Sequence, residues 1–383
     1  MQQIPVPKTL DVEVVEEHLS ALWQENAAQE EDAALLRARV ANLIVFVSTR
    51  GLLPELEDSM LGVTSTHPGR VLVMLAENDA PDQDIEMRVK ALCQSDKRTG
   101  AKRLCGEVVV LNAQGKFTVE LPSAGLPLLV SDLTTFLWWR NEFSISDKIF
   151  GSLLAASDRL VIDSDEFGSP LRDLREVDAL FAEDAYKHAG VSDLNWARLT
   201  FWRGLLADFY DVPAYRPLLD KVDHVQIDYT APANDQHTIA PQALLFAGWL
   251  SSCLGWTLKS SENKTSGDHQ STFTFSRGAD SQAVITLELN RVETGDRKAG
   301  RLAQVQLRST TKKQAVFLVK RSDDNHHILA EANVGADTQR GRVLPVRNRS
   351  LAQLLSREME ILVNDNLYQQ SLAVAVNLID QAS

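Results

Sequence analysis

The sequence is poor in cysteine, with only three among its 383 residues: Cys93, Cys105 and Cys253. Such a small, odd number does not fit the disulfide framework of a secreted domain, so we expect a reducing compartment. Long apolar runs are also missing, since no stretch reaches the roughly 18 residues of a membrane span. The N-terminus lacks the basic start and apolar stretch of a secretion signal. We therefore expect a cytoplasmic protein that does not associate with membranes.

Motifs of the common enzyme classes are absent as well. The chain contains neither Gly-x-Gly-x-x-Gly nor Gly-x-x-x-x-Gly-Lys-Ser/Thr, whose glycines let backbone amides approach phosphates. It also lacks His-Glu-x-x-His, Cys-x-x-Cys and Gly-x-Ser-x-Gly, and its eight histidines are scattered. We therefore expect no metal, no cofactor and no catalytic residue. A site assembled from distant carboxylates would leave no local motif, so an enzyme stays as an alternative.

An excess of positive charge is missing from the chain as a whole, whose net charge is -13. Nucleic acids and anionic membranes attract basic proteins, so we expect neither as a partner. Residues 297–349 differ, because they hold twelve lysines and arginines against four acidic residues. This segment could dock on an acidic face of a partner protein, or its charges could simply be solvated. The candidate contact residues are Arg308, Lys312, Lys313, Lys320 and Arg321.

The hydrophobic pattern predicts an α/β protein of two domains, since a single core rarely grows beyond about 250 to 300 residues. Residues 1–168 alternate apolar runs with helical spacing, which predicts a layered α/β sheet. Residues 169–383 start with helical patterns and continue with alternating strands, which predicts an α+β domain with a basic antiparallel meander. The expected helices cover residues 10–29, 52–61, 147–156, 171–188, 193–210, 240–254, 350–362 and 366–379. The expected strands cover 40–48, 70–76, 85–93, 107–112, 117–121, 136–139, 159–163, 272–276, 285–289, 303–307, 315–321 and 328–334.

The dipeptide Trp-Arg occurs twice, at Trp139-Arg140 and at Trp202-Arg203. Tryptophan and arginine are the residues most enriched at the energetic centres of protein interfaces. We therefore predict a partner contact at Trp138, Trp139 and Arg140. Alternation along a strand sends adjacent side chains to opposite faces, so one of the two tryptophans can equally belong to the core.

The second pair lies in a predicted helix. Trp202 falls on the apolar stripe of that helix, which places it in the core. Arg198 and Arg203 fall off the stripe, and either a partner contact or an internal ion pair would explain them.

Three further residues suggest chemistry. Arg70 follows His-Pro-Gly at the start of a strand and could hold an anion such as a phosphate, although a turn explains the segment as well. Cys93 and Cys105 flank a loop with four lysines and arginines, and nearby cations favour the reactive thiolate. This arrangement suggests a thioredoxin-responsive switch, with two inert thiols as the alternative. Cys253 lies in an apolar run and is expected to be buried.

The order of several segments resembles the glucose-6-phosphate dehydrogenase assembly protein family, OpcA. The matching segments are His67-Pro-Gly-Arg-Val-Leu-Val-Met74, Gly106-Glu-Val-Val-Val110, residues 126–140 ending in Trp-Trp-Arg, Ser157-Asp-Arg-Leu-Val-Ile-Asp163 and residues 193–203. The resemblance implies a non-catalytic protein that binds glucose-6-phosphate dehydrogenase and supports assembly of its active oligomer. In phototrophs, such a protein also raises the activity of the dehydrogenase, as an allosteric activator, and links the oxidative pentose phosphate pathway to redox state.

The resemblance leaves two alternatives to be tested. The first is an enzyme or sensor that binds a sugar phosphate or nucleotide in an unrecognised pocket, without a protein partner. The second is a general scaffold that binds several clients and has no specific kinetic effect on any of them.

Overall fold

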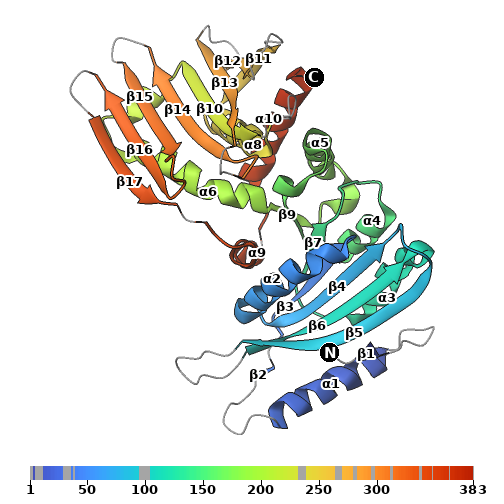
Figure 1. The fold of residues 1–383 in the computed structure, drawn as a ribbon. Coiled ribbons are helices and arrows are strands. Elements are labelled where there is room, and N and C mark those ends of the chain that lie inside the picture. Colours follow the sequence, from blue (N-terminus) through green and yellow to red (C-terminus); the bar gives the residue numbers. More distant parts are fainter. Residues whose placement is uncertain are drawn as a thin grey trace. The chain divides into compact units, whose positions relative to one another are not determined.

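The structure is a computed structural model, and its chain divides into two compact units. Unit 1 comprises Met1–Asp163, Leu180–Leu194 and Arg349–Asn364, and unit 2 comprises Ser164–Ala179, Asn195–Asn348 and Asp365–Ser383 (Figure 1). The predicted division at residue 168 treated each domain as one continuous segment, whereas the chain returns to unit 1 twice. The described residues are 3–4, 12–28, 36–37, 39–94, 104–231, 239–263, 270–278, 283–294, 298–310, 314–335, 339–346, 348–361 and 363–382.

Unit 1 is built on a mixed sheet whose central strands are parallel. Continuous apolar sequence produces these strands: every residue of β3 (Ala41–Val47) and β7 (Thr135–Arg140) is buried. The two strands lie side by side in parallel, with β4 on the other side of β3. The sheet order is β1 (Gln3–Ile4), β5 (Gln83–Gln94), β6 (Leu104–Gln114), β4 (Gly69–Glu77), β3, β7, β8 (Arg159–Ile162) and β9 (Gly190–Asp193), with β2 (Leu36–Arg37) also beside β6.

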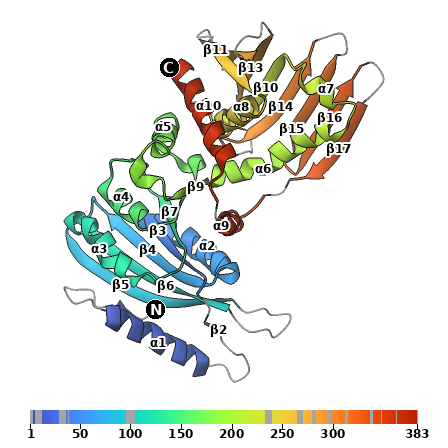
Figure 2. The same cartoon turned by 180° about the vertical axis from the view of Figure 1, so that it is seen from behind.

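Helices cover both faces of this sheet. Neighbouring residues of β6 show the two sides, because Gly106 abuts Thr64 of α2 (Leu53–Thr66) while Glu107 bonds Trp23 of α1 (Val12–Ala28). Figure 2 shows α1 beside the edge of the sheet that β5 and β6 form. The other helices of unit 1 are α3 (Leu121–Gly125), α4 (Lys148–Ala155) and α9 (Leu351–Glu360). The predicted layered α/β domain is therefore confirmed.

One predicted strand of unit 1 is wrong. Residues 117–121 lie in a 3-10 helix, Gly115–Glu120, and in the start of α3. Gly115 takes a φ of 58°, which turns the chain at the end of β6. Pro122 follows within the first turn of α3 and has no backbone N–H for a strand ladder.

Unit 2 contains the predicted antiparallel strands, but an additional strand lies between two of them. The strict alternation of β13 (Val284–Glu293) and β14 (Leu302–Ser309) is confirmed, since Leu287 and Val305 point inward at 0% exposure. The unpredicted β10 (His224–Ala231) lies between these two strands and pairs with β13 in parallel. The sheet order is β11 (Trp256–Asn263), β12 (Gln270–Arg277), β13, β10, β14, β15 (Ala315–Arg321), β16 (His327–Val334) and β17 (Gln339–Pro345).

α8 (Pro241–Cys253) and α10 (Asn366–Ala382) lie on one face of the unit 2 sheet (Figures 1 and 2). These two helices pack so closely that a Cβ on Gly248 would lie 2.0 Å from the carbonyl oxygen of Ser371. The remaining helices are α5 (Pro170–Leu180), α6 (Leu194–Ala207) and α7 (Arg216–Leu219). Among the described residues, no helix has the length and apolar character needed to cross a membrane.

Candidate functional site

The residues Trp138, Trp139 and Arg140 lie in β7, inside unit 1. Trp138 is 0% exposed and Trp139 is 3% exposed, with the latter ring stacked on Phe46 at 4.3 Å between centroids. Arg140 lies over the ring of Trp138 and forms an ion pair with Glu55 of α2 at 3.3 Å. The two indoles therefore pack within the core of unit 1. A partner contact by this segment stays a prediction, and the burial of these side chains does not favour it.

The second Trp-Arg pair lies in α6, where the burial of Trp202 agrees with the prediction from helical spacing. Trp202 is 4% exposed and belongs to the core of unit 2. Arg203 stacks on Trp196, with its guanidinium 3.5 Å from the ring centroid, an arrangement that cation–π attraction favours. Arg198 is half-buried on the same helix. Cys253, expected to be buried, is instead exposed at the last turn of α8, because the apolar run ends there.

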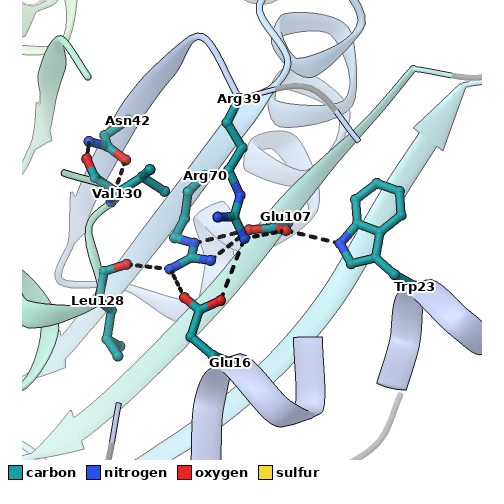
Figure 3. Close-up of polar contacts among 8 residues, drawn as sticks. All are labelled: Glu16, Trp23, Arg39, Asn42, Arg70, Glu107, Leu128 and Val130. Carbon is teal, nitrogen blue, oxygen red and sulfur yellow. Dashed lines mark hydrogen bonds and ion pairs between the residues drawn. The ribbon is translucent and has the colours of Figure 1, made fainter. Parts of the chain in front are cut away.

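A cluster of four charged residues lies between α1 and the sheet of unit 1 (Figure 3). At its centre Arg70 of β4 donates two hydrogen bonds to Glu107 of β6, at 3.1 and 2.8 Å. Its third nitrogen donates to Glu16 of α1 at 2.6 Å and to the carbonyl oxygen of Leu128 at 2.7 Å. Arg39 also donates to Glu107, at 2.9 Å. We name Glu16, Arg39, Arg70 and Glu107 the charge cluster.

The charge cluster joins α1 to the sheet. On α1, Val15 and Leu19 are fully buried, and the indole Nε1 of Trp23 donates to Glu107 at 2.9 Å. Arg39 also forms an ion pair with Glu16 at 3.5 Å. Two positive and two negative charges balance one another in a place where an unpaired charge would be costly. The polar contacts therefore fix where α1 lies, while its apolar residues supply burial.

Three members of the charge cluster, Glu16, Arg70 and Glu107, have pKa values shifted so that the charged form is favoured. Burial alone would raise the pKa of Glu107, but hydrogen bonds and charges from Arg39 and Arg70 outweigh it and lower the pKa to about 2. Burial likewise opposes the charge of Glu16, yet the bond and charge of Arg70 lower its pKa below 4.5. Burial would lower the pKa of Arg70, whereas Glu16 and Glu107 raise it above its ordinary value. Glu16, Arg70 and Glu107 therefore stay charged near neutral pH.

These contacts test the prediction that Arg70 binds an external anion. The Arg70 side chain is 2% exposed, and its donors serve two carboxylates and a backbone carbonyl of the same unit. An anion would have to displace Glu16, the most exposed member at 40%. The Arg70 guanidinium therefore links β4 to β6 and to α1 within unit 1. The prediction that it binds an external anion is wrong for this arrangement.

The predicted basic residues divide between the two faces of the unit 2 sheet, because side chains alternate along a strand. Arg308 of β14 and Lys320 of β15 occupy half-buried positions of the face opposite the helices. Arg321 follows Lys320 and has the opposite orientation. Lys312 and Lys313 lie outside the described residues. The segment is therefore not one uniformly positive surface.

Other cations of the segment form ion pairs within unit 2. Lys298 and Arg301 both bond Asp165, and Arg301 does so at 2.8 Å. Arg342 of β17 bonds Asp208 at 2.7 Å. These pairs account for part of the +8 charge balance of residues 297–349 without a partner.

The face opposite the helices also carries apolar side chains. Leu318 of β15 stands opposite Glu331 in the register with β16, and Lys320 stands opposite Leu329. Val343 of β17 stands opposite Leu329 in turn and is 62% exposed. Together with Val316, these residues form a diagonal apolar strip across three strands, flanked by Arg308 and Lys320 and also by the acidic Glu331. We name the strip and these two cations the open sheet face; its members are Arg308, Val316, Leu318, Lys320, Leu329 and Val343.

Cys93 and Cys105 occupy opposed positions on the antiparallel strands β5 and β6. Opposed residues in such a pair have Cα atoms about 4.5 or 5.5 Å apart, and both spacings fall within the range of about 4.4 to 6.8 Å seen for disulfides. The two side chains themselves lie outside the described residues. The backbone register therefore brings together two residues that have eleven residues between them in the sequence.

Comparison with protein families assigns the chain. The N-terminal domain of a glucose-6-phosphate dehydrogenase subunit family, OpcA, matches residues 62–179, and the C-terminal domain of the same family matches residues 189–372. The chain belongs to the OpcA family. This assignment confirms the resemblance found in the sequence, and it includes both β7 and the open sheet face.

Curated OpcA relatives come from cyanobacteria. The OxPP cycle protein OpcA of Nostoc punctiforme is 30% identical over 310 residues, covering 79% of this chain and 63% of that protein. The OpcA of Synechocystis sp. is 26% identical over 336 residues, covering 86% of this chain and 68% of that protein. The chain thus spans about two thirds of the length of these relatives.

Solved structures with a similar arrangement are oxidoreductases. Levoglucosan dehydrogenase with NADH and L-sorbose has a TM-score of 0.49 and 11% identity, covering 90% of this chain and 98% of that one. An NAD binding oxidoreductase from Klebsiella pneumoniae has a TM-score of 0.49 and 13% identity, covering 90% and 97%. Scores this low carry no argument about the activity of an OpcA protein.

Proposed function

We propose that this chain is a non-catalytic assembly factor and activator that binds glucose-6-phosphate dehydrogenase in the cytoplasm. The observation that carries the proposal is the family match over both units, under a description that names a subunit of that dehydrogenase. The lack of nucleotide, metal and nucleophile motifs in the sequence is consistent with a binding role. Binding would activate the enzyme if the chain has a higher affinity for its active oligomer than for its inactive forms.

The open sheet face is our candidate for the dehydrogenase contact. An apolar strip flanked by charged side chains is typical of protein interfaces, where a dry centre supplies affinity and charges steer association. Arg308 and Lys320 would then meet acidic residues of the dehydrogenase. This placement keeps part of the predicted docking of the basic segment and moves its centre to Leu318 and Leu329.

Glutamate substitutions on the open sheet face test the placement. We expect Lys320→Glu and Leu318→Glu each to weaken binding to purified dehydrogenase at least tenfold, since hot-spot substitutions cost about 2 kcal/mol or more. Biolayer interferometry with the immobilised dehydrogenase measures the affinity. Lys221→Glu is the matched control, because Lys221 is exposed and lies outside the sheet. Unchanged affinity in both face variants would exclude this surface, while the partner itself could still bind elsewhere.

We further propose that Cys93 and Cys105 form a redox switch for this interaction. A thiolate of reduced thioredoxin would attack the Cys93–Cys105 disulfide; both chain cysteines would end as thiols, and thioredoxin would end as the disulfide. The support is their opposed register, together with the four lysines and arginines of the connecting loop in the sequence.

Thiol labelling tests the switch. After mild oxidation we expect mass spectrometry to find a Cys93–Cys105 linkage that reduced thioredoxin removes, and dehydrogenase activation to differ between the two states. Cys253→Ser is the control that should keep the difference, whereas Cys93→Ser should abolish it. Full alkylation of both cysteines after oxidation would argue against the switch.

A further inference from the structure

The parallel strands of unit 1 are arranged in an order that is typical of folds that bind a dinucleotide cofactor. Along the sheet they run β6, β4, β3, β7, β8 and β9, and each adjacent pair is parallel. Numbered by their appearance in the chain, they give 3-2-1-4-5-6, the order of doubly wound dinucleotide-binding folds. Such folds bind their ligand at the carboxyl ends of the strands where the order reverses. In unit 1 that place is the edge where Val47 of β3 lies beside Arg140 of β7.

The first requirement of a dinucleotide site is a glycine-rich turn after the first strand. The turn between β3 and α2 here reads Ser48-Thr-Arg-Gly-Leu52, with a single glycine. Gly51 does not have a positive φ, and a Cβ added to it would meet only Thr49, at an ordinary 3.6 Å. Neither a left-handed turn nor a close approach requires this glycine. The turn therefore lacks the backbone cradle that lets phosphates approach.

The second requirement is a helix N-terminus with free N–H groups and no competing negative charge. In α2, Pro54 occupies the first turn and has no N–H, and no side chain caps the helix. Glu55 adds a carboxylate to the same turn, where it would repel a pyrophosphate. Arg140, a cation at this edge, forms an ion pair with Glu55 at 3.3 Å, and the Arg140 side chain is 3% exposed.

The third requirement is an acidic residue that accepts the ribose hydroxyls. Glu77, the last residue of β4, is the acid at the end of the second parallel strand. Its carboxylate accepts from Nε of Arg50 at 2.6 Å and from the amide of Gln114 at 2.9 Å. Arg50 lies in the turn that would hold the phosphates of a dinucleotide, and Glu77 is the acid that would accept its ribose hydroxyls. One ion pair therefore engages residues from both parts of such a site.

We infer that unit 1 is a dinucleotide-type fold whose cofactor edge is closed by two ion pairs, Arg50–Glu77 and Arg140–Glu55, and binds no nicotinamide dinucleotide. The first pair joins the β3–α2 connection to β4, and the second joins the first turn of α2 to β7. The fold thus serves as a scaffold at the place where related topologies carry out chemistry. The inference holds for unit 1 alone and does not depend on the proposed partner.

Direct binding measurements on the full chain test the inference. NADP+, NADPH and NAD+ are titrated by calorimetry into the wild-type chain and into Ser48→Trp, which puts a bulky side chain in the turn. A nicotinamide-dependent dehydrogenase serves as the positive control for the titration.

We expect no saturable heat up to millimolar nucleotide in either protein. Binding of equal affinity in both proteins would lie away from this edge and would leave the inference standing. Saturable binding to the wild type that weakens tenfold or more in Ser48→Trp would overturn it.

Discussion

At the scale of single residues, Arg70 and Glu107 illustrate how a buried charge constrains a fold. The side chain of Arg70 is 2% exposed and that of Glu107 is 1% exposed, so neither charge can be hydrated if its partner is removed. Breaking such a pair from one side is costly, because the remaining charge stays buried. The same two residues also hold α1 through Glu16 and Trp23.

Arg70→Ala should therefore destabilise unit 1 by about 3 to 5 kcal/mol, the usual cost of removing one partner of a buried pair. Urea denaturation followed by circular dichroism measures the free energy of unfolding. Arg50→Ala is the control: its side chain is 49% exposed, so we expect a loss of at most about 1 kcal/mol. A loss below 1 kcal/mol in Arg70→Ala would contradict the internal role of this arginine.

The charge cluster also predicts a pH dependence. The pKa of Glu107 is about 2 in the folded protein and 4.5 for an ordinary glutamate, so its ionisation stabilises the fold above pH 4.5. This stabilisation is lost as the pH falls from 4.5 towards 2. We expect the stability difference between wild type and Glu107→Gln to shrink over that window in urea titrations at successive pH values. A difference that stays constant from pH 6 to pH 2.5 would show that Glu107 titrates normally.

The sequence indicated some of these residues but not their association. Arg70 and Glu107 are isolated charges in otherwise apolar strand sequences, and such isolation was the available signal of a buried pair. Sequence reasoning missed Glu16, Trp23 and Arg39, because their partners lie 54, 84 and 68 positions away in the chain. Burial of Trp202, by contrast, was predictable from helical spacing alone, because its neighbours on the stripe lie within one helix.

At the scale of elements, helix packing in unit 1 depends on a close approach of α2 and α9. A Cβ on Gly62 would lie 2.6 Å from the Cβ of Ala352, a separation that real Cβ atoms do not adopt. Ala352 has no flexible end that could move away, so the helices themselves would have to separate. This contact could not be predicted from the sequence, because α9 follows all the strands of unit 2.

Two alanine substitutions should consequently have opposite effects. Gly62→Ala should destabilise the protein by about 1 to 3 kcal/mol through overpacking, less the helix propensity that alanine gains. Gly204→Ala in α6 should stabilise it by up to about 1 kcal/mol, since nothing lies within 4 Å of the added Cβ. Thermal unfolding of both variants measures the difference. Stabilisation by Gly62→Ala would mean that α9 does not pack on α2 as described.

Local sequence pattern predicted most elements, and the exceptions have different causes. The capping box of Ser350 with Gln353 is present where Ser350 was expected to start a helix. The parallel pairing of β10 with β13 could not be predicted, since strand order depends on contacts between distant segments. The predicted strand at 117–121 was wrong because its alternation is short and the turn at Gly115 and Pro122 opposes it.

At the scale of the whole molecule, two features support a protein that acts by binding. Unit 1 has the strand order of a cofactor-binding fold with ion pairs at the expected cofactor edge. Unit 2 presents a sheet face with an apolar strip, on which Val343 is 62% exposed. Membership of the OpcA family supports the proposal that glucose-6-phosphate dehydrogenase is the partner of this face.

The kinetics of purified glucose-6-phosphate dehydrogenase, with and without an equimolar amount of this chain, test the central claim most directly. We expect the chain to raise kcat/KM for glucose 6-phosphate and to shift the dehydrogenase towards its active oligomer in size-exclusion chromatography. Leu318→Glu should reduce both effects and Lys221→Glu should preserve them. Unchanged rate, substrate affinity and oligomer distribution with the wild-type chain would contradict the proposed function.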